Sequence, residues 1–461
     1  MNNVKEKLDI WQKVWLIMPV AIWFSYYPLM GLGQDDTMNF KLSITMIYMA
    51  VLAVVGIPII LRKWRTLIKN RAVLFATVFV GWNGVSLLWT TNLTRGILTC
   101  GMIGIVYLIF LSMIAEREKI LKILPALIKI LTITTVVMCV LAWVQMVAGI
   151  WLGQNETFLC SGCVAVQFGF VRPNAFAIEP QFFGNILLAP ALILLWRIMK
   201  KQGNWRTNLV FIFVAATLIL TLSRGAIFAF GAGVIILFIC IRALKPVLLG
   251  LSFAAIGVFV ALFMQGITAE INPNHDETFG GAVTKSIHQL SMGVIDLRAK
   301  NPAPSAPKDD VETTIAEPES TTNFDGYVAE STDTRLELSR LAIATWAQKP
   351  STILFGVGIG GSGVAMHETF LDQRAAREIV QNEFVEILLE NGVVGAAIFL
   401  CIIIGLFYKT RRKKWTWAII AAFLIQWNFF SGYPSALHIY PILAMILLCA
   451  AADQNLPKRA P

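Results

Sequence analysis

Apolar residues run along the chain in blocks of roughly 15 to 25 residues, the length that an α-helix needs to cross a bilayer core. Short polar segments separate these blocks. Windowed hydropathy predicts about twelve membrane-spanning helices. They lie at residues 14–33, 42–61, 72–90, 96–115, 123–149, 175–196, 208–223, 225–242, 246–266, 380–408, 415–432 and 435–452. The pattern predicts an all-α, polytopic integral membrane protein, whose first apolar block is a retained helix rather than a cleaved signal peptide.

One long polar interval interrupts this pattern, between Gly266 and Gly395. It divides the chain into three expected parts: an N-terminal bundle of about nine spans at 1–266, a large loop at 267–379, and about three C-terminal spans with a tail at 380–461. Loops held by a rigid scaffold tend to carry function. We therefore expect the large loop to contribute to the functional site.

The distribution of Lys and Arg predicts the orientation of these helices. If both termini are cytoplasmic, 24 Lys and Arg residues lie in cytoplasmic segments and four lie in the short outer loops. Because positive charge concentrates on the cytoplasmic side, the large loop is expected to face outward, away from the cytoplasm. The net charge of +10 is then a sign of topology, and no nucleic acid is expected as a partner. The outer compartment also lacks ATP and nucleotide sugars.

The cysteines and histidines indicate no metal centre. Five of the seven cysteines lie within apolar spans, where they act as small apolar side chains. Cys160 and Cys163 form a C-x-x-C in an outer loop, where a disulfide can form, but further zinc ligands at suitable spacing are missing. His367 and Glu368 do not make an H-E-x-x-H motif. We expect neither a metal nor another cofactor.

A glycine run near the end of the large loop matches G-x-G-x-x-G at Gly356, Gly358 and Gly361. The motif follows a helix and a proline instead of a strand, so it does not indicate a dinucleotide site. We interpret it as a flexible turn that returns the loop to the membrane.

Candidate polar residues first gather at the start of the sixth expected span. Pro180 suits the first turn of a helix, which puts Glu179 at its outer N-terminal edge. Helix N-termini stabilise carboxylates and phosphates. Glu179 either caps this helix, or it acts as a base or orients a sugar in a cavity shared with three substrate-binding candidates, Arg172, Gln181 and Asn185. Charged groups at membrane depth commonly mark functional sites.

Arg224 interrupts a long apolar run in the sequence Ser-Arg-Gly. The 14 residues from Leu209 to Leu222 extend about 21 Å as a helix, which is short of the roughly 30 Å hydrocarbon core. Arg224 is therefore expected below the outer surface, facing a cavity or a partner. A snorkelling arginine at a hairpin tip is the alternative.

The polar interval is expected to hold a disordered insert followed by a helix. Residues 296–333 are rich in Pro, Ser, Thr and acidic residues and poor in aromatic ones, which is typical of disorder. A capping box from Thr334 to Glu337 is expected to open the helix, and Lys349-Pro350 to end it. Arg335 would lie in the first turn, where beside Arg224 it could clamp a pyrophosphate. Arg340, farther along, is a further substrate-binding candidate.

These motifs resemble the O-antigen ligase and O-antigen polymerase superfamily. The shared features are S-R-G between two spans, an R-x₁₀-W helix followed by P-x₅-G-x-G, and N-x₅-L-x-E-x-G-x-x-G opening the span after the loop. They extend from Arg172 to Gly395. The resemblance implies a membrane glycosyltransferase of the C type, in the inner (cytoplasmic) membrane of a bacterial cell, that uses an undecaprenyl-pyrophosphate-linked glycan.

The resemblance also implies roles for individual residues. Arg224 and Arg335 would hold the lipid pyrophosphate, which is the leaving group. The family commonly has His-Asn where this chain has Gln381-Asn382, and Gln381 cannot replace a histidine base because an amide does not titrate. Either Glu179 supplies the base, or the reaction depends mainly on stabilising the leaving group. Gln381 and Asn382 would hydrogen-bond sugar or phosphate.

We therefore expect a metal-independent polymerase of cell-surface polysaccharide repeat units, with a lipid-linked glycan, membrane lipid and a chain-length regulator as its partners. Glu179-Pro180 after an outer loop favours the polymerases of the superfamily. An O-antigen ligase, which transfers the glycan to lipid A core or a protein, is the nearest alternative. A transporter of lipid-linked oligosaccharide would need polar residues in both halves of the membrane. A structural membrane protein would leave Arg224 without a role.

Overall fold

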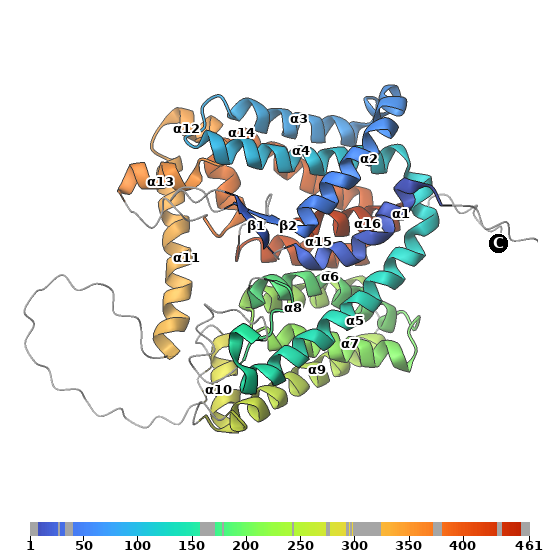
Figure 1. The fold of residues 1–461 in the computed structure, drawn as a ribbon, viewed down its shortest axis with the longest axis vertical. Helices are drawn as coiled ribbons and strands as arrows, with labels where there is room; N and C mark the ends of the chain where they lie inside the picture. The colour runs from blue at the N-terminus through green and yellow to red at the C-terminus, as the bar shows by residue number, and fades with distance from the viewer. Residues whose placement is uncertain are drawn as a thin grey trace, which may run out of the picture.

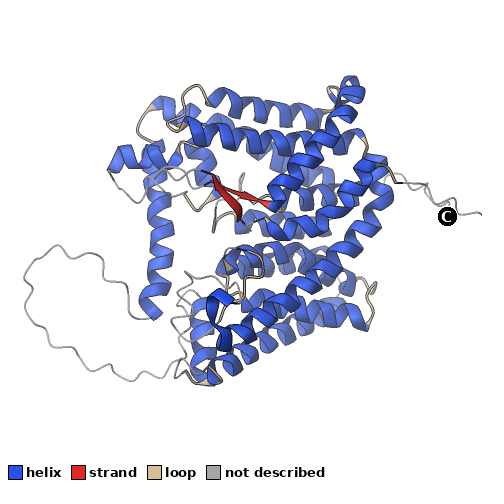
Figure 2. Ribbon diagram, viewed as in Figure 1, coloured by secondary structure: helices blue, strands red, loops and turns tan. Residues whose placement is uncertain are grey.

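A computed structural model describes most of the chain, and its described residues are almost entirely helical (Figure 2). These residues are 8–25, 28–32, 40–156, 171–177, 179–241, 244–272, 277–291, 295, 297, 324–371, 380–430 and 436–452. The pair Cys160 and Cys163 lies outside them, as does most of the insert that is expected to be disordered.

A helix occurs at each segment that is expected to span the membrane. These helices are α1 (Ile10–Ala21), α2 (Ile44–Leu67), α3 (Arg71–Ser86), α4 (Leu93–Ala115), α5 (Arg117–Glu156), α6 (Pro180–Met199), α7 (Trp205–Leu220), α8 (Arg224–Ile241), α9 (Leu244–Glu270), α14 (Glu383–Thr410), α15 (Trp415–Gln426) and α16 (Ile439–Ala452). Seven helices of the described chain, α2, α4, α5, α6, α8, α9 and α14, are long and apolar enough to cross a membrane. The expectation of a helical, polytopic membrane protein is confirmed, and the count of twelve spans remains a prediction.

The first expected span, 14–33, is shorter in the structure. α1 continues as a short 3-10 helix, η1 (Ile22–Phe24), and then ends. The strand β1 (Pro28–Leu32) follows and pairs antiparallel with β2 (Phe40–Ser43). Pro28 has no backbone N–H, and a proline is well placed at the first residue of a strand. A two-stranded hairpin therefore occupies the end of the segment that hydropathy alone predicts to be helix.

The helices form two groups that pack side by side. In Figure 1, α3 and α4 run along one edge of the molecule and α7 and α9 along the opposite edge, with α6 and α15 between them. α4 packs on α2, α9 packs on α7, and α15 packs on both α8 and α6. α11 (Phe324–Trp346) lies across one end of these groups, roughly perpendicular to apolar helices such as α4 and α9 (Figure 1).

The described residues between α9 and α14 form four helices. They are α10 (Phe279–Leu290), α11, α12 (Pro350–Phe355) and α13 (Ser362–Phe370). The prediction that a capping box opens a helix at Thr334 is wrong, because α11 begins at Phe324 and Thr334 lies inside it. No proline interrupts the sequence from Phe324 to Thr334, so the helix extends through the expected boundary. The expected separation at Lys349-Pro350 is present, since Pro350 is the first residue of α12.

α14 is broken where hydropathy predicts a continuous span. Gly392 has φ 63° and ψ −173°, which is outside the helical region. A side chain at Gly392 would collide with the backbone carbonyl of Leu354, which packs directly against the break. The indole N–H of Trp82 donates to the carbonyl oxygen of Asn391 at 3.1 Å and so satisfies an acceptor at the break. The residues before Gly392 therefore form a separate short helix, which we call the polar segment of α14 (residues 383–391).

Candidate functional site

Arg335 joins three helices that are far apart in sequence. Its Nε donates to the Oε1 of Gln381 at 3.1 Å, and its Nη2 donates to the Oε1 of Gln181 at 3.0 Å. Arg335 belongs to α11, Gln181 to α6, and Gln381 lies just before α14. The structure thus brings together three residues that the sequence analysis selected. We call this group the arginine junction.

Both glutamines of the arginine junction lie at the N-termini of helices. Pro180 is the first residue of α6 and Gln181 the second, as predicted from the proline. Gln381 has φ 56°, which is uncommon for a residue with a side chain, and Asn382 caps α14 immediately afterwards. Helix N-termini carry partial positive charge. With the guanidinium of Arg335 between them, the junction favours an anion.

Arg224 begins α8, directly after the hairpin tip at residues 221–223. The tip is strained, since Leu222 has φ 48°. It packs on α6: a Cβ placed on Gly184 would come within 2.9 Å of the Ala226 Cβ and 3.0 Å of the Thr221 Oγ1. α6 therefore contacts the Arg224 hairpin near its beginning, three residues after the glutamine that binds Arg335.

Arg172 also reaches this hairpin. Its Nε donates to the backbone oxygen of Thr221 at 2.8 Å, so at least one edge of the guanidinium is engaged by the protein. The structure places Arg172 next to the tip that precedes Arg224, as expected for residues of one site. A contact of Arg172 with substrate remains a prediction.

Glu179 and Asn185 flank the glutamine of α6 in different environments. Glu179 is the N-cap residue of α6 in an extended conformation, but its side chain makes no capping hydrogen bond. The carboxylate is exposed to solvent. Asn185 is fully buried, and neither its Nδ2 nor its Oδ1 has a hydrogen-bond partner among the described residues. Buried amides are usually paired, so Asn185 has free hydrogen-bonding capacity near the junction.

Two further candidates have ordinary structural positions. Asn382 uses its Oδ1 to accept from the backbone N–H of Phe384 at 3.2 Å and of Val385 at 3.3 Å, which makes it the N-cap of α14. Arg340 lies exposed on α11, five residues beyond Arg335 and so on a different face of the helix. Their proposed contacts with sugar or phosphate remain predictions.

The sequence analysis missed a buried acidic face on the polar segment of α14. Glu383, Glu386 and Glu390 are each at most 5% exposed. The Nη2 of Arg95, on α4, lies 3.7 Å from the Oε1 of Glu386. Ser362 at the start of α13 donates its hydroxyl to Glu386 at 3.5 Å and its backbone N–H to Glu390 at 3.4 Å. Spacings of three and four residues put acidic side chains on one helix face, so the signal was present in the sequence.

The glycine run is hydrogen-bonded on two sides in the structure, and its expected flexibility remains a prediction. Backbone N–H groups of Val357 and Gly358 donate to the carbonyls of Leu389 and Glu390 at 2.9 and 3.0 Å. On the other side, the hydroxyl of Thr90 donates to the carbonyl of Ile359 at 2.8 Å. Three glycines of the run, at 356, 358 and 360, have positive φ, which side chains disfavour. The loop thereby ties the corner between α3 and α4 to the polar segment of α14.

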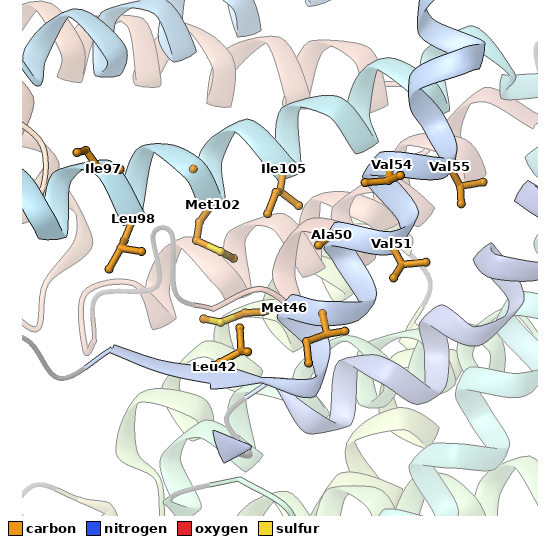
Figure 3. Close-up of a pocket in the computed structure, with 12 residues that line it drawn as sticks. Leu42, Met46, Ala50, Val51, Val54, Val55, Ile97, Leu98, Met102 and Ile105 are labelled. Carbon is orange, nitrogen blue, oxygen red and sulfur yellow. The ribbon is translucent and has the colours of Figure 1, made fainter. Parts of the chain in front are cut away.

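An apolar groove of about 700 Å³ lies between α4, α2 and the strand β2 (Figure 3). Figure 3 shows Leu98 and Met102 of α4 facing Leu42 and Met46 across it. Its lining consists of apolar side chains and one glycine: Leu42, Met46, Ile47, Ala50, Val51, Val54, Val55, Ile97, Leu98, Gly101, Met102 and Ile105. Arg95 is one helical turn before Leu98, so a charged group lies close to one end of the groove.

The apolar helices and the arginine junction define a polytopic membrane protein with a polar site where three helices meet. Residues 209–400 match the family model described as O-Antigen ligase. This segment begins in α7, ends in α14 and contains Arg224, Arg335 and Gln381. Over these residues the chain is similar to that family, and the expected relation to the O-antigen ligase and polymerase superfamily is confirmed. No curated protein matches the chain. The family supports an enzyme of the glycosyltransferase type.

Proposed function

We propose that the protein polymerises cell-surface polysaccharide at the outer face of the cytoplasmic membrane. It would transfer an undecaprenyl-pyrophosphate-linked glycan onto a sugar hydroxyl of another lipid-linked repeat unit. The oxygen of that hydroxyl forms a bond to the anomeric carbon of the donor glycan, and the bond from this carbon to the pyrophosphate oxygen breaks. Undecaprenyl pyrophosphate leaves with the bonding electrons, and the hydroxyl proton passes to a base.

The arginine junction is the observation that supports this proposal most strongly. A guanidinium and two helix N-termini converge at one place, and together they suit the negative charge that develops on a pyrophosphate leaving group. Arg335 would bind that group, with Arg224 contributing from the neighbouring hairpin. Both glutamines present amide oxygens to Arg335 and so would hold the guanidinium in one orientation.

The candidates for the remaining roles also lie around α6. Glu179 is the proposed general base, and its side chain is not used in a capping bond. Asn185 would bind a sugar hydroxyl, since its buried amide has no partner among the described residues. The apolar groove between α2 and α4 suits the hydrocarbon chain of a lipid-linked substrate, because its lining is apolar.

An O-antigen ligase is the second candidate, and the family match favours it. The matched family carries that description. A ligase would use the same donor and leaving group, and it would transfer the glycan to lipid A core or a protein. The arginine junction serves both reactions equally, because they differ in the acceptor.

Incubation of the purified protein with synthetic undecaprenyl-pyrophosphate repeat units, followed by gel separation, distinguishes these functions. We expect a ladder of longer lipid-linked chains without nucleotide and with EDTA present. Transfer that appears only after lipid A core or a protein acceptor is added would instead establish a ligase. If intact protein forms neither product, the transferase proposal is wrong, and a transporter of lipid-linked oligosaccharide becomes the better explanation.

A further inference from the structure

The hairpin tip before Arg224 ends in carbonyl groups that its own helix cannot satisfy. The last carbonyls of an α-helix lack partners within the helix, and here they belong to Leu220, at the end of α7, and to the residues that follow it. Leu222 has φ 48°, so the backbone there is also strained. Contacts from outside the hairpin must hold this conformation.

Three side chains from different parts of the fold supply donors to three consecutive carbonyls. Gln265 of α9 donates its Nε2 to the oxygen of Leu220 at 3.5 Å, and also to that of Val171 at 3.2 Å. Arg172 donates its Nε to the oxygen of Thr221 at 2.8 Å. Gln289 of α10 donates its Nε2 to the oxygen of Leu222 at 3.4 Å. We call these three side chains the tip brace.

The two glutamines of the tip brace contribute little net stability for their burial. Gln265 is 1% exposed and Gln289 is 4% exposed. Neither Oε1 has a hydrogen-bond partner among the described residues. A buried, unmatched acceptor offsets much of what a single donated hydrogen bond gains. Stability alone therefore explains these two residues poorly, whereas holding a strained backbone next to an arginine explains their position.

We infer that Gln265 and Gln289 are positioning residues that, together with Arg172, fix the direction in which Arg224 leaves the hairpin. They act through the carbonyls of the tip and need no contact with substrate. The consequence for the reaction rests on the proposed function, in which Arg224 binds the lipid pyrophosphate. Sites that must stabilise a leaving group depend on supporting residues that hold the charged side chain in one geometry. α10 would then be part of the site's support, although it lies in the interval expected to be a loop.

Hydrogen exchange tests the tip brace without any ligand. Methionine has a similar unbranched shape but no donor. Gln289→Met therefore removes the bond to Leu222, and Gln265→Met removes the bonds to Leu220 and Val171. We expect amides of residues 221–226 to exchange about fivefold faster in either variant. The matched control is Ser286→Ala on α10, because its buried hydroxyl has no hydrogen-bond partner among the described residues. Unchanged exchange at the tip in both methionine variants, with the protein folded, would overturn the inference.

A double-mutant cycle then tests whether the brace acts through Arg224. We expect Gln289→Met to weaken binding of undecaprenyl pyrophosphate about fivefold in the wild-type background and less than about twofold in the Arg224→Ala background. Equal weakening in both backgrounds would contradict the positioning role. Gln265→Met provides the same cycle if the first variant does not fold. If the wild-type protein does not bind this lipid, the proposed function fails, while the exchange result still decides whether the brace exists.

Discussion

Two arginines contact the region where α14 begins, one through amide oxygens and the other beside a carboxylate. Arg335 donates to two neutral amide oxygens, those of Gln181 and Gln381. Arg95 lies 3.7 Å from the carboxylate of Glu386, which is 5% exposed. Amide oxygens orient a guanidinium without neutralising it, whereas a carboxylate compensates its charge. Under the proposed function, this contrast suits Arg335 to binding an anion and Arg95 to a mainly structural role.

The largest effect is expected at Arg335. Arg335→Ala should lower the rate of polymer formation by about 100- to 1000-fold, the range found when a group that stabilises transition-state charge is removed. Arg335→Lys should lose about tenfold, because an ammonium cannot reproduce the planar fork of donors. The rate of ladder formation measures both. Glu337→Gln, an exposed position on α11, is the control. A rate for Arg335→Ala within about threefold of wild type would refute its assignment.

The break in α14 gives the next largest effect, on stability. Gly392→Ala forces a side chain into a positive-φ position and against the Leu354 carbonyl, so we expect a loss of about 3 kcal/mol. Thermal melting in detergent measures the loss. Gly405→Ala is the matched control on the same helix, because nothing lies within 4 Å of its added Cβ. If Gly392→Ala and Gly405→Ala have the same melting temperature, the break at Gly392 does not hold the polar segment of α14 in place.

Arg95→Ala should reduce stability more than it changes the chemistry. It leaves Glu386 buried without the nearby guanidinium, and we expect a loss of about 2 kcal/mol, given the partial exposure of Arg95. Adding Glu386→Gln should restore most of the melting temperature, since a neutral amide needs no counter-charge. Arg95→Ala protein that remains folded should form polymer at the wild-type rate per molecule. If Arg95→Ala instead abolishes polymer formation in folded protein, the two arginines do not differ as described.

The smallest effect is expected at Gln181. Gln181→Ala removes a hydrogen bond that orients Arg335, which is worth about 1 kcal/mol, or roughly a fivefold rise in KM for the lipid-linked donor. Gln202→Ala, an exposed glutamine after α6, should leave KM unchanged. Steady-state kinetics on both variants test whether the amide supports the guanidinium. A KM for Gln181→Ala equal to that of the control would mean that Gln181 is not needed to orient Arg335.

Hydropathy predicted most helices because an apolar block long enough to cross a bilayer is a local property of the sequence. The start of α6 at Pro180 was also predictable, since proline removes a donor that the first turn does not need. The break at Gly392 was not, because it depends on a chain segment that packs against it. The start of α11 at Phe324 could not be predicted, because a polar sequence without proline is compatible with either disorder or helix.

The candidate site was predicted in part, for a similar physical reason. Arg335, Gln181 and Gln381 each stood out as polar groups at the ends of apolar segments. Tertiary packing decides which of these side chains meet. The sequence analysis therefore predicted Arg335 beside Arg224 and did not predict its contacts with the two glutamines. Arg95 and Glu386 were overlooked together, because each gains significance only beside the other. The tip brace was likewise invisible, since backbone carbonyls carry no sequence signal.

The most direct test of the account is the affinity of the purified protein for undecaprenyl pyrophosphate, compared between wild type, Arg335→Ala and Arg95→Ala at one temperature where all three are folded. We predict that Arg335→Ala weakens binding by more than about tenfold, while Arg95→Ala stays within about twofold of wild type. Equal affinities for wild type and Arg335→Ala would contradict the assignment of the pyrophosphate to the arginine junction.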